Sequence, residues 1–458
     1  MNNITTKLTT ISLILIVILS SLIIAIQFNP EVKSEEKVEK NKRQVFNNSS
    51  KGKRWDVKGM TFILIKGTFY EMGYQQGILL KDEITTNRRA LTNFFENEGV
   101  FRKDLIELWN KQKDFVPEKI IDFIQGMADA LNLTFEDLAI SWVTEGVFYS
   151  KCCSISTWGK ATKDGKLLHI RSMEFPLNIQ DPETGTYVQE NPVIVIAKPD
   201  NGFSFMYPTF AGYVIEDGIN EKGIAVANIW SSNHDHNDYG EPMGIRLFEI
   251  LYSAETAEEA IDILTTHKTY GYNFIVSDAK KPIGYAVETT ASQTYYGTWD
   301  NPSESHRPFW EIEDTVRRAN CFLNYDTSSK QRDQYNLRTF NNVFIEKMKG
   351  ERWFYIWHQF KALSKIVDKN WGELDVHTGM ISLRNMYQGE SYNPMWNFIM
   401  KKIFEEVWWH WSACPETGEI MISFADEKNS GQYSQIIGFN YMEIIEKEEL
   451  GRIDLIQS

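Results

Sequence analysis

Two adjacent cysteines, Cys152 and Cys153, are the residues of this sequence that are best suited to covalent chemistry. They stand where a segment with a helical pattern gives way to short β-rich runs. A thiol with an ordinary pKa of about 8.5 needs a base or a positive neighbour to become a good nucleophile. That base is either a distant His, as in papain-like enzymes, or the α-amine of the Cys itself after cleavage of the preceding peptide bond. The residue types alone leave both arrangements open.

Other motifs for nucleophilic, phosphate-binding or metal chemistry are missing from the sequence. It contains no G-x-S-x-G elbow, no P-loop, no H-E-x-x-H and no C-x-x-C. His234 and His236 form the only close His pair, and the surrounding Asp and Asn residues favour a solvated loop over a metal site. We therefore expect neither a cofactor nor a bound metal.

The cysteine count argues against a scaffold built on disulfides. Four Cys are too few for one, and adjacent Cys residues are strained as a bridge. Cys321 and Cys414 either form one bridge outside the cell or are two ordinary buried thiols. The sequence favours neither alternative.

Four blocks, in the expected order along the chain, resemble one enzyme family. They read GTFYEMGYQQG (67–77), CCSISTWGKATKDGKLLHIRSMEF (152–175), GINEKGIAVANIW (218–230) and RANCF (318–322). The family is that of the isopenicillin-N acyltransferase-like (acyl-CoA:aminopenicillanic acid acyltransferase), autoproteolytic Ntn cysteine hydrolases. The resemblance implies a nucleophile that becomes N-terminal by self-cleavage, so it favours the α-amine as the base.

By this resemblance the nucleophile falls on Cys152, because Trp158 and Gly159 keep the family's offset from that residue. Cys153 then stands where the family carries a hydroxyl residue. The alternative nucleophile is Cys153, one position further on.

Three further residues match the family's catalytic set: Arg171, Glu174 and Asn320. For Arg171 and Glu174 the resemblance implies charge complementarity near the amine and the substrate, and orientation of the nucleophile. For Asn320 it implies stabilisation of the oxyanion of the tetrahedral intermediate, to which a fixed amide donor is suited. Asn228 is the next candidate for that role.

The sequence departs from the family pattern at four positions near these residues. Lys151 replaces the usual Gly before the nucleophile, Ser172 replaces an Asn, Glu174 replaces an Asp, and Cys321 replaces the His after Asn320. One extra methylene can displace a carboxylate by roughly 1 Å, which matters where catalysis depends on position. An inactive Ntn-fold binding protein tethered to a membrane is therefore the alternative to an enzyme.

The elements around these residues predict an α+β fold. A short strand from Phe62 precedes helical patterns, and Thr134 with Asp137 predicts a capping box at one helix start. After the Cys pair, short β-rich runs are separated by turns and followed by an amphipathic helix that opens at Thr256. This order suggests antiparallel sheets covered by helices. The family resemblance implies an Ntn-hydrolase four-layer αββα sandwich with a helical N-terminal segment.

The N-terminal residues 1–28 predict a signal anchor or a signal peptide. The uncharged run from Ile11 to Phe28 approaches the roughly 20 apolar residues that cross a bilayer, and it lacks an obvious small-x-small cleavage site. Residues 29–54 have the composition of a flexible charged tether. We expect the Ntn domain over 55–458, with 55–151 and 152–458 as separate chains after self-cleavage. The expected location is membrane-anchored or exported, extracytoplasmic or lumenal.

Charge excludes one class of partner. The formal net charge is -14, and no long basic run follows the N-terminal tail, which argues against nucleic-acid binding. The expected partners are a small-molecule or lipid-like acyl amide and, through the N-terminal run, a membrane.

The predicted activity is hydrolysis or transfer of the acyl group of a non-peptide or peptide-like amide, through an acyl-enzyme on Cys152. Members of the family act on N-acyl amides, β-lactam precursors and acyl peptides, so the resemblance does not select one substrate. A phospholipase-B-like or ceramidase-like lipid hydrolase is a further alternative, because those enzymes share the broader fold.

Overall fold

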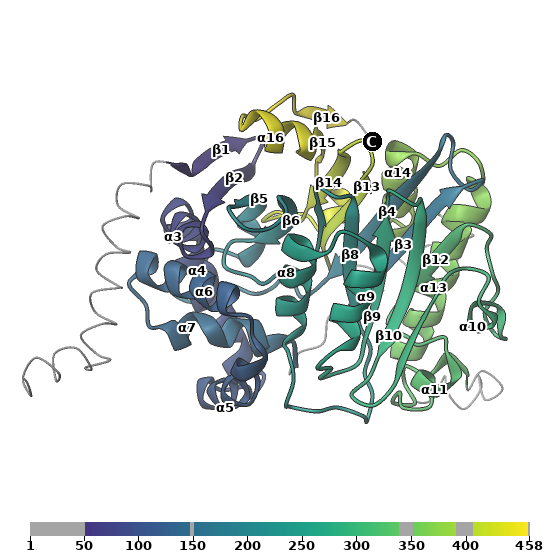
Figure 1. Ribbon diagram of the computed structural model, residues 1–458, viewed down its shortest axis with the longest axis horizontal. Helices are drawn as coiled ribbons and strands as arrows, with labels where there is room; N and C mark the ends of the chain where they lie inside the picture. Colours follow the sequence, from purple (N-terminus) through teal and green to yellow (C-terminus); the bar gives the residue numbers. More distant parts are fainter. Residues whose placement is uncertain (1–50, 147–150, 339–350, 391–405, 457–458) are drawn as a thin grey trace, which may run out of the picture. The chain divides into compact units, whose positions relative to one another are not determined.

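Two β-sheets form the inner layers of the domain in the computed structural model (Figure 1). The first sheet has nine strands in the order β1-β2-β5-β6-β7-β8-β9-β10-β11. They are β1 (Lys53–Val57), β2 (Met60–Gly67), β5 (Pro192–Pro199), β6 (Phe205–Phe210), β7 (Asp217–Asn220), β8 (Ile224–Trp230), β9 (Tyr272–Asp278), β10 (Ile283–Thr289) and β11 (Thr294–Gly297). Strands β2 and β5 pair in parallel, and the other neighbours in this sheet pair antiparallel.

The second sheet carries the predicted nucleophile strand. It has seven antiparallel strands in the order β12-β3-β4-β13-β14-β15-β16. They are β12 (Thr315–Arg318), β3 (Lys151–Gly159), β4 (Gly165–Glu174), β13 (Val407–Cys414), β14 (Glu419–Phe424), β15 (Ile436–Asn440) and β16 (Asp454–Ile456). Cys152 pairs with Met173 and Cys153 with Ser172 across β3 and β4, so the register of these two strands fixes the neighbours of both thiols.

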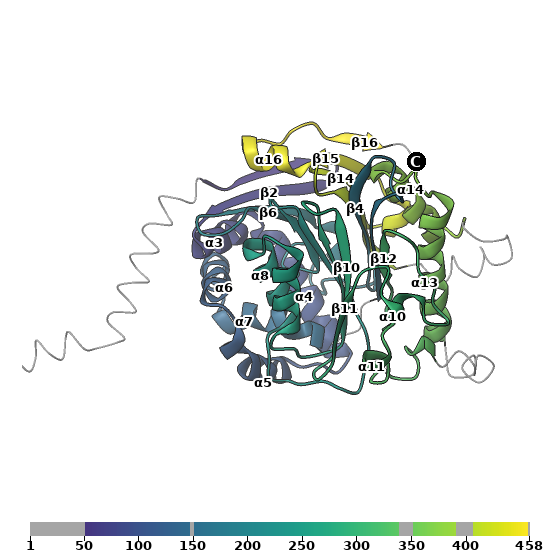
Figure 2. The same cartoon turned by 45° about the vertical axis from the view of Figure 1, so that its right-hand side comes forward.

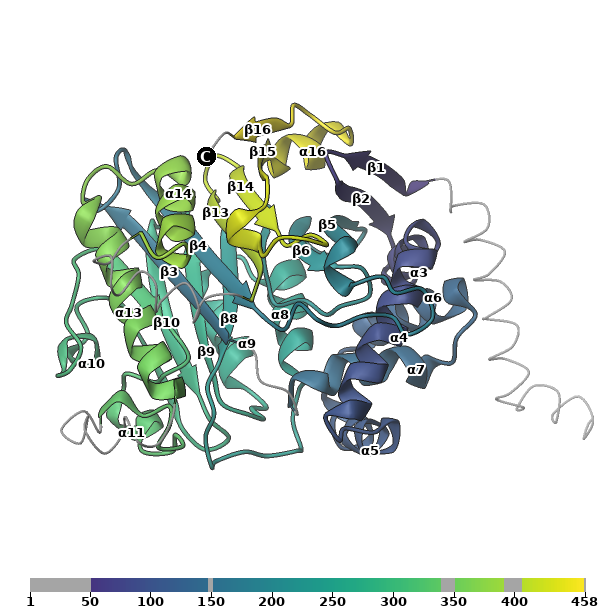
Figure 3. The same cartoon turned by 180° about the vertical axis from the view of Figure 1, so that it is seen from behind.

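Helices cover the outer face of each sheet (Figures 2 and 3). The first sheet is covered by the helical N-terminal segment and by two later helices. These are α3 (Phe69–Leu79), α4 (Lys81–Asn97), α5 (Arg102–Gln112), α6 (Glu118–Leu131), α7 (Phe135–Ala139), α8 (Met243–Ser253) and α9 (Ala257–Thr265). The second sheet is covered by α13 (Glu351–Lys369) and α14 (Val376–Tyr387), which lie against β3, β4 and β13 in Figure 3. The predicted α+β class and the four-layer αββα arrangement are confirmed.

Shorter elements connect these layers. They are η2 (Lys113–Phe115), η3 (Ile140–Gly146), η4 (Val188–Glu190), α10 (Pro302–Ser305), α11 (Tyr325–Ser328), η6 (Gly431–Tyr433) and α16 (Tyr441–Lys447). The structure describes residues 51–146, 151–338, 351–390 and 406–456. The described residues from 52 onward form one unit.

The predicted anchor at residues 11–28 lies outside the described part of the chain. Within the described part, no helix combines the length and the apolar composition needed to cross a bilayer.

Local sequence signals explain the helices that precede the nucleophile. The capping box predicted at Thr134 is present: its hydroxyl accepts from the Asp137 N–H at 3.2 Å, and the Asp137 carboxylate accepts from the Thr134 N–H at 3.3 Å. In the first sequence block, Gly73 lies where α3 crosses α6. A Cβ at Gly73 would stand 1.9 Å from the backbone oxygen of Phe123, so only glycine permits this close approach.

The two faces of β3 bury the adjacent cysteines in different surroundings. Side chains alternate along a strand, so neighbouring residues point to opposite faces of the sheet. Cys152 belongs to the core between the sheets, with Met173 and Trp409, whereas Cys153 belongs to the core under the helices. All four cysteines are buried thiols outside any disulfide, so the alternative of a bridge between Cys321 and Cys414 is not realised.

Candidate active site

Cys152, Arg171 and Asn320 come together between the sheets, although they are far apart in the sequence. Cys152 is the second residue of β3 and is fully buried. Its backbone N–H donates to Asn320 Oδ1 at 3.0 Å, and Arg171 Nη2 donates to its Sγ at 3.3 Å. A thiol next to a guanidinium is an arrangement that favours the thiolate.

Arg171 forms an ion pair with Asp217, a carboxylate that the sequence analysis did not identify. Arg171 Nε lies 3.2 Å from Asp217 Oδ2, and both side chains are fully buried. Burial opposes the charge on Arg171, but the charges of Cys152 and Asp217 raise the pKa of its guanidinium above the ordinary value. Burial also raises the pKa of Asp217 to about 6, against the effect of Arg171. Trp409 Nε1 donates to the same carboxylate oxygen at 3.1 Å.

Asn320 lies just beyond the end of β12, and its side-chain amide connects two strands of different sheets. Its Oδ1 accepts from the Cys152 N–H, and its Nδ2 donates to the backbone oxygen of Trp230 at 2.7 Å. A side-chain amide has two N–H donors and one carbonyl acceptor. Asn320 is therefore oriented with its acceptor toward the backbone nitrogen that self-cleavage would turn into an amine.

Glu174 lies on the other face of the second sheet, behind the nucleophile strand. It is fully buried and accepts from the hydroxyls of Tyr355 and Tyr387, from Ser172 Oγ at 2.8 Å, and from Gln359 Nε2 at 3.1 Å. Burial raises the pKa of the Glu174 carboxyl, and the tyrosine hydroxyls act in the opposite direction. The structure thus brings Glu174 next to Cys153 rather than next to Cys152.

The surroundings of Cys153 keep its thiol protonated. Its Sγ lies 3.2 Å from the hydroxyl of Tyr387. Burial, followed by the charge of Glu174, raises the pKa of the Cys153 thiol well above its usual range. Because a thiolate is the nucleophilic form, these surroundings favour Cys152 over Cys153.

The alternative oxyanion donor and the His pair lie in other surroundings. Asn228 on β8 donates to Glu216 Oε2 at 2.6 Å and to Met243 Sδ at 2.9 Å. His236 stacks on Tyr270 in the loop before α8. Among the described residues, no group of three or more His, Cys, Asp or Glu is arranged to hold a metal ion.

The sequence reading missed several residues of this region, for different reasons. Asp217 directly precedes the third block, which begins at Gly218, so its position next to a recognised block was the available signal. Tyr355 and Gln359 are one turn apart on α13, and Tyr387 ends α14. Nothing in the sequence distinguishes these three residues from ordinary members of a helix core.

One family model matches part of this chain. The family described as acyl-coenzyme A:6-aminopenicillanic acid acyl-transferase matches residues 184–338. The matched region includes the third and fourth sequence blocks and lies after Cys152. It confirms the resemblance to this acyltransferase family. Over these residues the chain is similar to that acyltransferase family.

Two curated relatives cover a similar share of the chain. Protein dcd1A of Dictyostelium discoideum is 23% identical over 235 residues, which cover 44% of this chain and 52% of the relative. Protein dcd1B of the same organism is 23% identical over 248 residues, 47% of each chain. The chain spans about half the length of these relatives.

Solved structures with distant similarity include two bacterial enzymes. A mutant of conjugated bile acid hydrolase from Clostridium perfringens shows 12% identity and a TM-score of 0.34, over 67% of this chain and 97% of that one. Penicillin V acylase from Agrobacterium tumefaciens shows 12% identity and a TM-score of 0.34, over 63% and 91%. Values at this level add no further conclusion about this chain.

Proposed function

We propose that this protein is a cysteine-nucleophile amide hydrolase or acyltransferase that acts after self-cleavage between Lys151 and Cys152. The observation that carries the proposal is the position of Cys152, with its Sγ next to Arg171 and its N–H on Asn320. In self-cleavage, Cys152 Sγ attacks the carbonyl carbon of Lys151, and the peptide nitrogen leaves as the amine of Cys152. Water then hydrolyses the thioester and releases Lys151 as a carboxylate.

The same residues then serve the second reaction. The freed amine of Cys152 accepts the thiol proton, and Arg171 stabilises the thiolate. The thiolate attacks the carbonyl of an N-acyl amide, the amine half of the substrate leaves with a proton, and an acyl thioester remains on Cys152. Water gives hydrolysis, and an acceptor amine gives acyl transfer. An N–H of Asn320, with a backbone amide, stabilises the oxyanion in both steps.

The sequence of any new N-terminus tests the self-cleavage. Purified full-length protein is run on a denaturing gel, and each fragment is sequenced from its N-terminus. A fragment that begins at Cys152 supports the proposal, and one that begins at Cys153 moves the nucleophile by one residue. An intact chain that also fails to turn over N-acyl substrates contradicts the proposal and favours the binding protein.

A lipid amide or ester is the second candidate substrate class, and a partly apolar cavity favours it. A cavity of about 100 Å³ lies between α4 and η3; its lining includes the apolar Leu91 and Phe95 and the charged Arg88, Arg102 and Asp137. The hydroxyl of Tyr213, which lines this cavity, donates to Glu216 at 3.2 Å. Turnover of a series of N-acyl substrates of increasing chain length would test this. A preference for short acyl groups would contradict it.

We also propose that residues 1–28 hold the protein at a membrane or direct its export, because the run from Ile11 to Phe28 is uncharged and apolar. Deletion of residues 1–50, which keeps β1 (Lys53–Val57) whole, is expected to give a folded protein that no longer sediments with membranes. Aggregation of the truncated protein would instead show that the run belongs to the domain core.

A further inference from the structure

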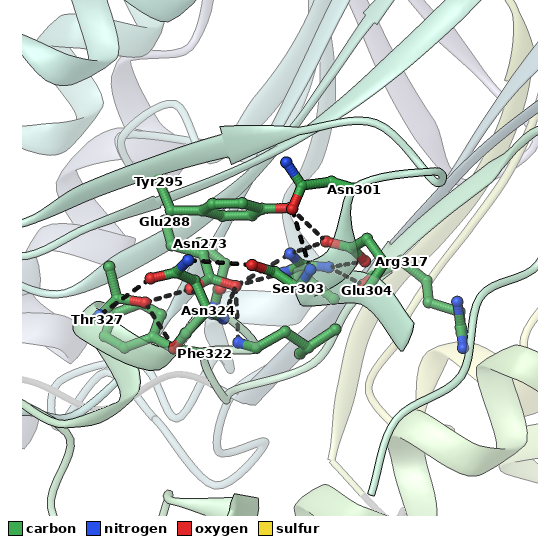
Figure 4. A network of polar contacts seen from close by, with 12 residues as sticks. Asn273, Glu288, Tyr295, Asn301, Ser303, Glu304, Arg317, Phe322, Asn324 and Thr327 are labelled. Atoms are coloured by element: carbon green, nitrogen blue, oxygen red, sulfur yellow. Dashed lines mark hydrogen bonds and ion pairs between the residues drawn. The ribbon is translucent and has the colours of Figure 1, made fainter. Parts of the chain in front are cut away.

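One buried carboxylate, that of Glu288 on β10, binds the chain on both sides of Asn320. Before Asn320, Arg318 Nε donates to Glu288 Oε1 at 3.0 Å. After Asn320, the N–H groups of Leu323 and Asn324 donate to Oε1 at 2.7 Å and to Oε2 at 3.2 Å. The hydroxyl of Thr327 also donates to Oε2, as Figure 4 shows. A single side chain thus binds the residues on both sides of Asn320.

A second carboxylate, that of Glu304 on α10, completes the shell of Arg318 without touching the loop after Asn320. Arg318 donates to Glu304 through Nη1 at 2.8 Å and through Nη2 at 2.5 Å. The hydroxyl of Tyr295 donates to the same carboxylate at 3.0 Å. Figure 4 shows Glu288 and Glu304 in one network of polar contacts, which Asn324 joins through its Nδ2 bond to Ser303 Oγ at 3.0 Å. The two carboxylates share one cation but have different further partners.

The surroundings of Glu288 match an ionised carboxylate. Glu288 and Arg318 are fully buried. Burial raises the pKa of Glu288, whereas Arg318, the Thr327 hydroxyl and the Leu323 N–H act in the opposite direction. An ionised carboxylate only accepts hydrogen bonds, and every partner named above is a donor. Replacement of one oxygen by an NH2 group would set a donor against these donors and release the loop.

We propose that Glu288 is a positioning residue for Asn320: it holds the residues before and after Asn320 so that the amide keeps its contact with the Cys152 nitrogen. This inference rests on the proposed function of the Cys152 site. Glu304 has the same charge and binds the same guanidinium, but it makes no contact with residues 321–328 among the described hydrogen bonds. A comparison with Glu304 therefore separates a positioning role of Glu288 from a contribution to fold stability.

The test compares Glu288→Gln with its matched control, Glu304→Gln. Both variants remove one buried charge next to Arg318, so both should lower the melting temperature. Only Glu288→Gln should also lower kcat, by about tenfold to a hundredfold at nearly unchanged KM, because a misplaced catalytic group costs rate out of proportion to its displacement. Equal kcat losses in the two variants would overturn the proposal.

A milder pair of variants covers the case in which these proteins fold poorly. Thr327→Val removes one hydroxyl from Glu288, and Tyr295→Phe removes one from Glu304. The first is expected to lower kcat severalfold and the second to leave it unchanged. Equal values of kcat in these two variants would contradict the positioning role.

Hydrogen exchange separates this inference from the proposed function, because it needs no turnover. The Leu323 and Asn324 amides donate directly to Glu288. The amide hydrogens of the proteolytic peptide that contains Leu323 and Asn324 should therefore exchange at least about tenfold faster in Glu288→Gln than in Glu304→Gln. Unchanged protection overturns the inference even in an active enzyme. Lost protection in a protein without turnover supports the positioning role and counts against the proposed function alone.

Discussion

Strand β3 carries two adjacent thiols, and its two faces surround them with opposite charges. Between the sheets, Cys152 lies next to Arg171, which is itself paired with Asp217. Under α13 and α14, Cys153 lies next to Tyr387 and close to the carboxylate of Glu174. A cation lowers the cost of a thiolate, and a buried anion raises it. Two residues of the same type, one position apart, thus have neighbours of opposite charge.

The largest expected effect comes from replacing one thiol at a time. Cys152→Ala should abolish chain cleavage and acyl turnover, because no other group can take the place of the attacking sulfur. Cys153→Ser should retain much of both, because that thiol is held in its protonated form. Gel analysis of cleavage and a generic N-acyl substrate measure the two outcomes. The reverse pattern would assign the nucleophile to Cys153.

The next effect concerns Asn320. Asn320→Asp keeps the acceptor toward Cys152 but exchanges the N–H donors for a negative charge. It should remove about 3 to 4 kcal/mol of transition-state stabilisation, two to three decades in rate, at nearly constant substrate affinity. The turnover rate is the measurement, and the melting temperature is the control. A collapse of the melting temperature would identify Asn320 as a structural residue, with Asn228 as the next oxyanion candidate.

The ion pair of Arg171 with Asp217 should appear in the pH dependence. Since the pKa of Asp217 is raised to about 6, kcat/KM should fall as the pH drops through that value, and Asp217→Asn should remove this acidic limb. The raised pKa favours the protonated carboxyl in the folded state. The resulting stability is full below about pH 3.8 and is lost as the pH rises to about 6. An acidic limb that persists in Asp217→Asn would contradict the assignment.

The α+β class could be predicted from the sequence because its signals are local, whereas the four-layer arrangement was implied by the family resemblance. Alternating strands bounded by turns, and the capping box at Thr134, need no knowledge of distant residues. The contact of Arg171 with Asp217 joins residues 46 positions apart in different sheets, so no local pattern contains it. The partners of Glu174 on α13 and α14 follow from helix packing, which has no short motif.

The separation of Arg171 and Glu174 onto two faces of one strand could have been predicted from the sequence, because side chains alternate along a strand. Arg171 and Glu174 are three positions apart on the same strand, β4. An odd separation on a strand places two side chains on opposite faces of the sheet. The family resemblance groups the two residues functionally, whereas the strand geometry separates them. The assigned roles of Cys152, Arg171, Glu174 and Asn320 stay predictions.

The smallest expected effect on turnover is that of Glu174→Gln, and it tests the separation of the two faces most directly. The substitution keeps the shape of the side chain and removes the charge behind Cys153. It should lower the free energy of unfolding by about 1 to 3 kcal/mol, because buried tyrosine hydroxyls lose a charged acceptor.

The same variant should change kcat by less than about threefold, because the carboxylate contacts the helix side of the sheet and not Cys152. Glu174→Asp is the informative companion, since Asp is the residue that the family carries at this position. A shorter carboxylate reaches Tyr355 and Tyr387 less well, so we expect Glu174→Asp to be no better than Glu174→Gln in stability and no faster in turnover. If Glu174→Gln instead lost two decades in rate at an unchanged melting temperature, and Glu174→Asp restored it, the carboxylate would act on the chemistry of Cys152 through the strand.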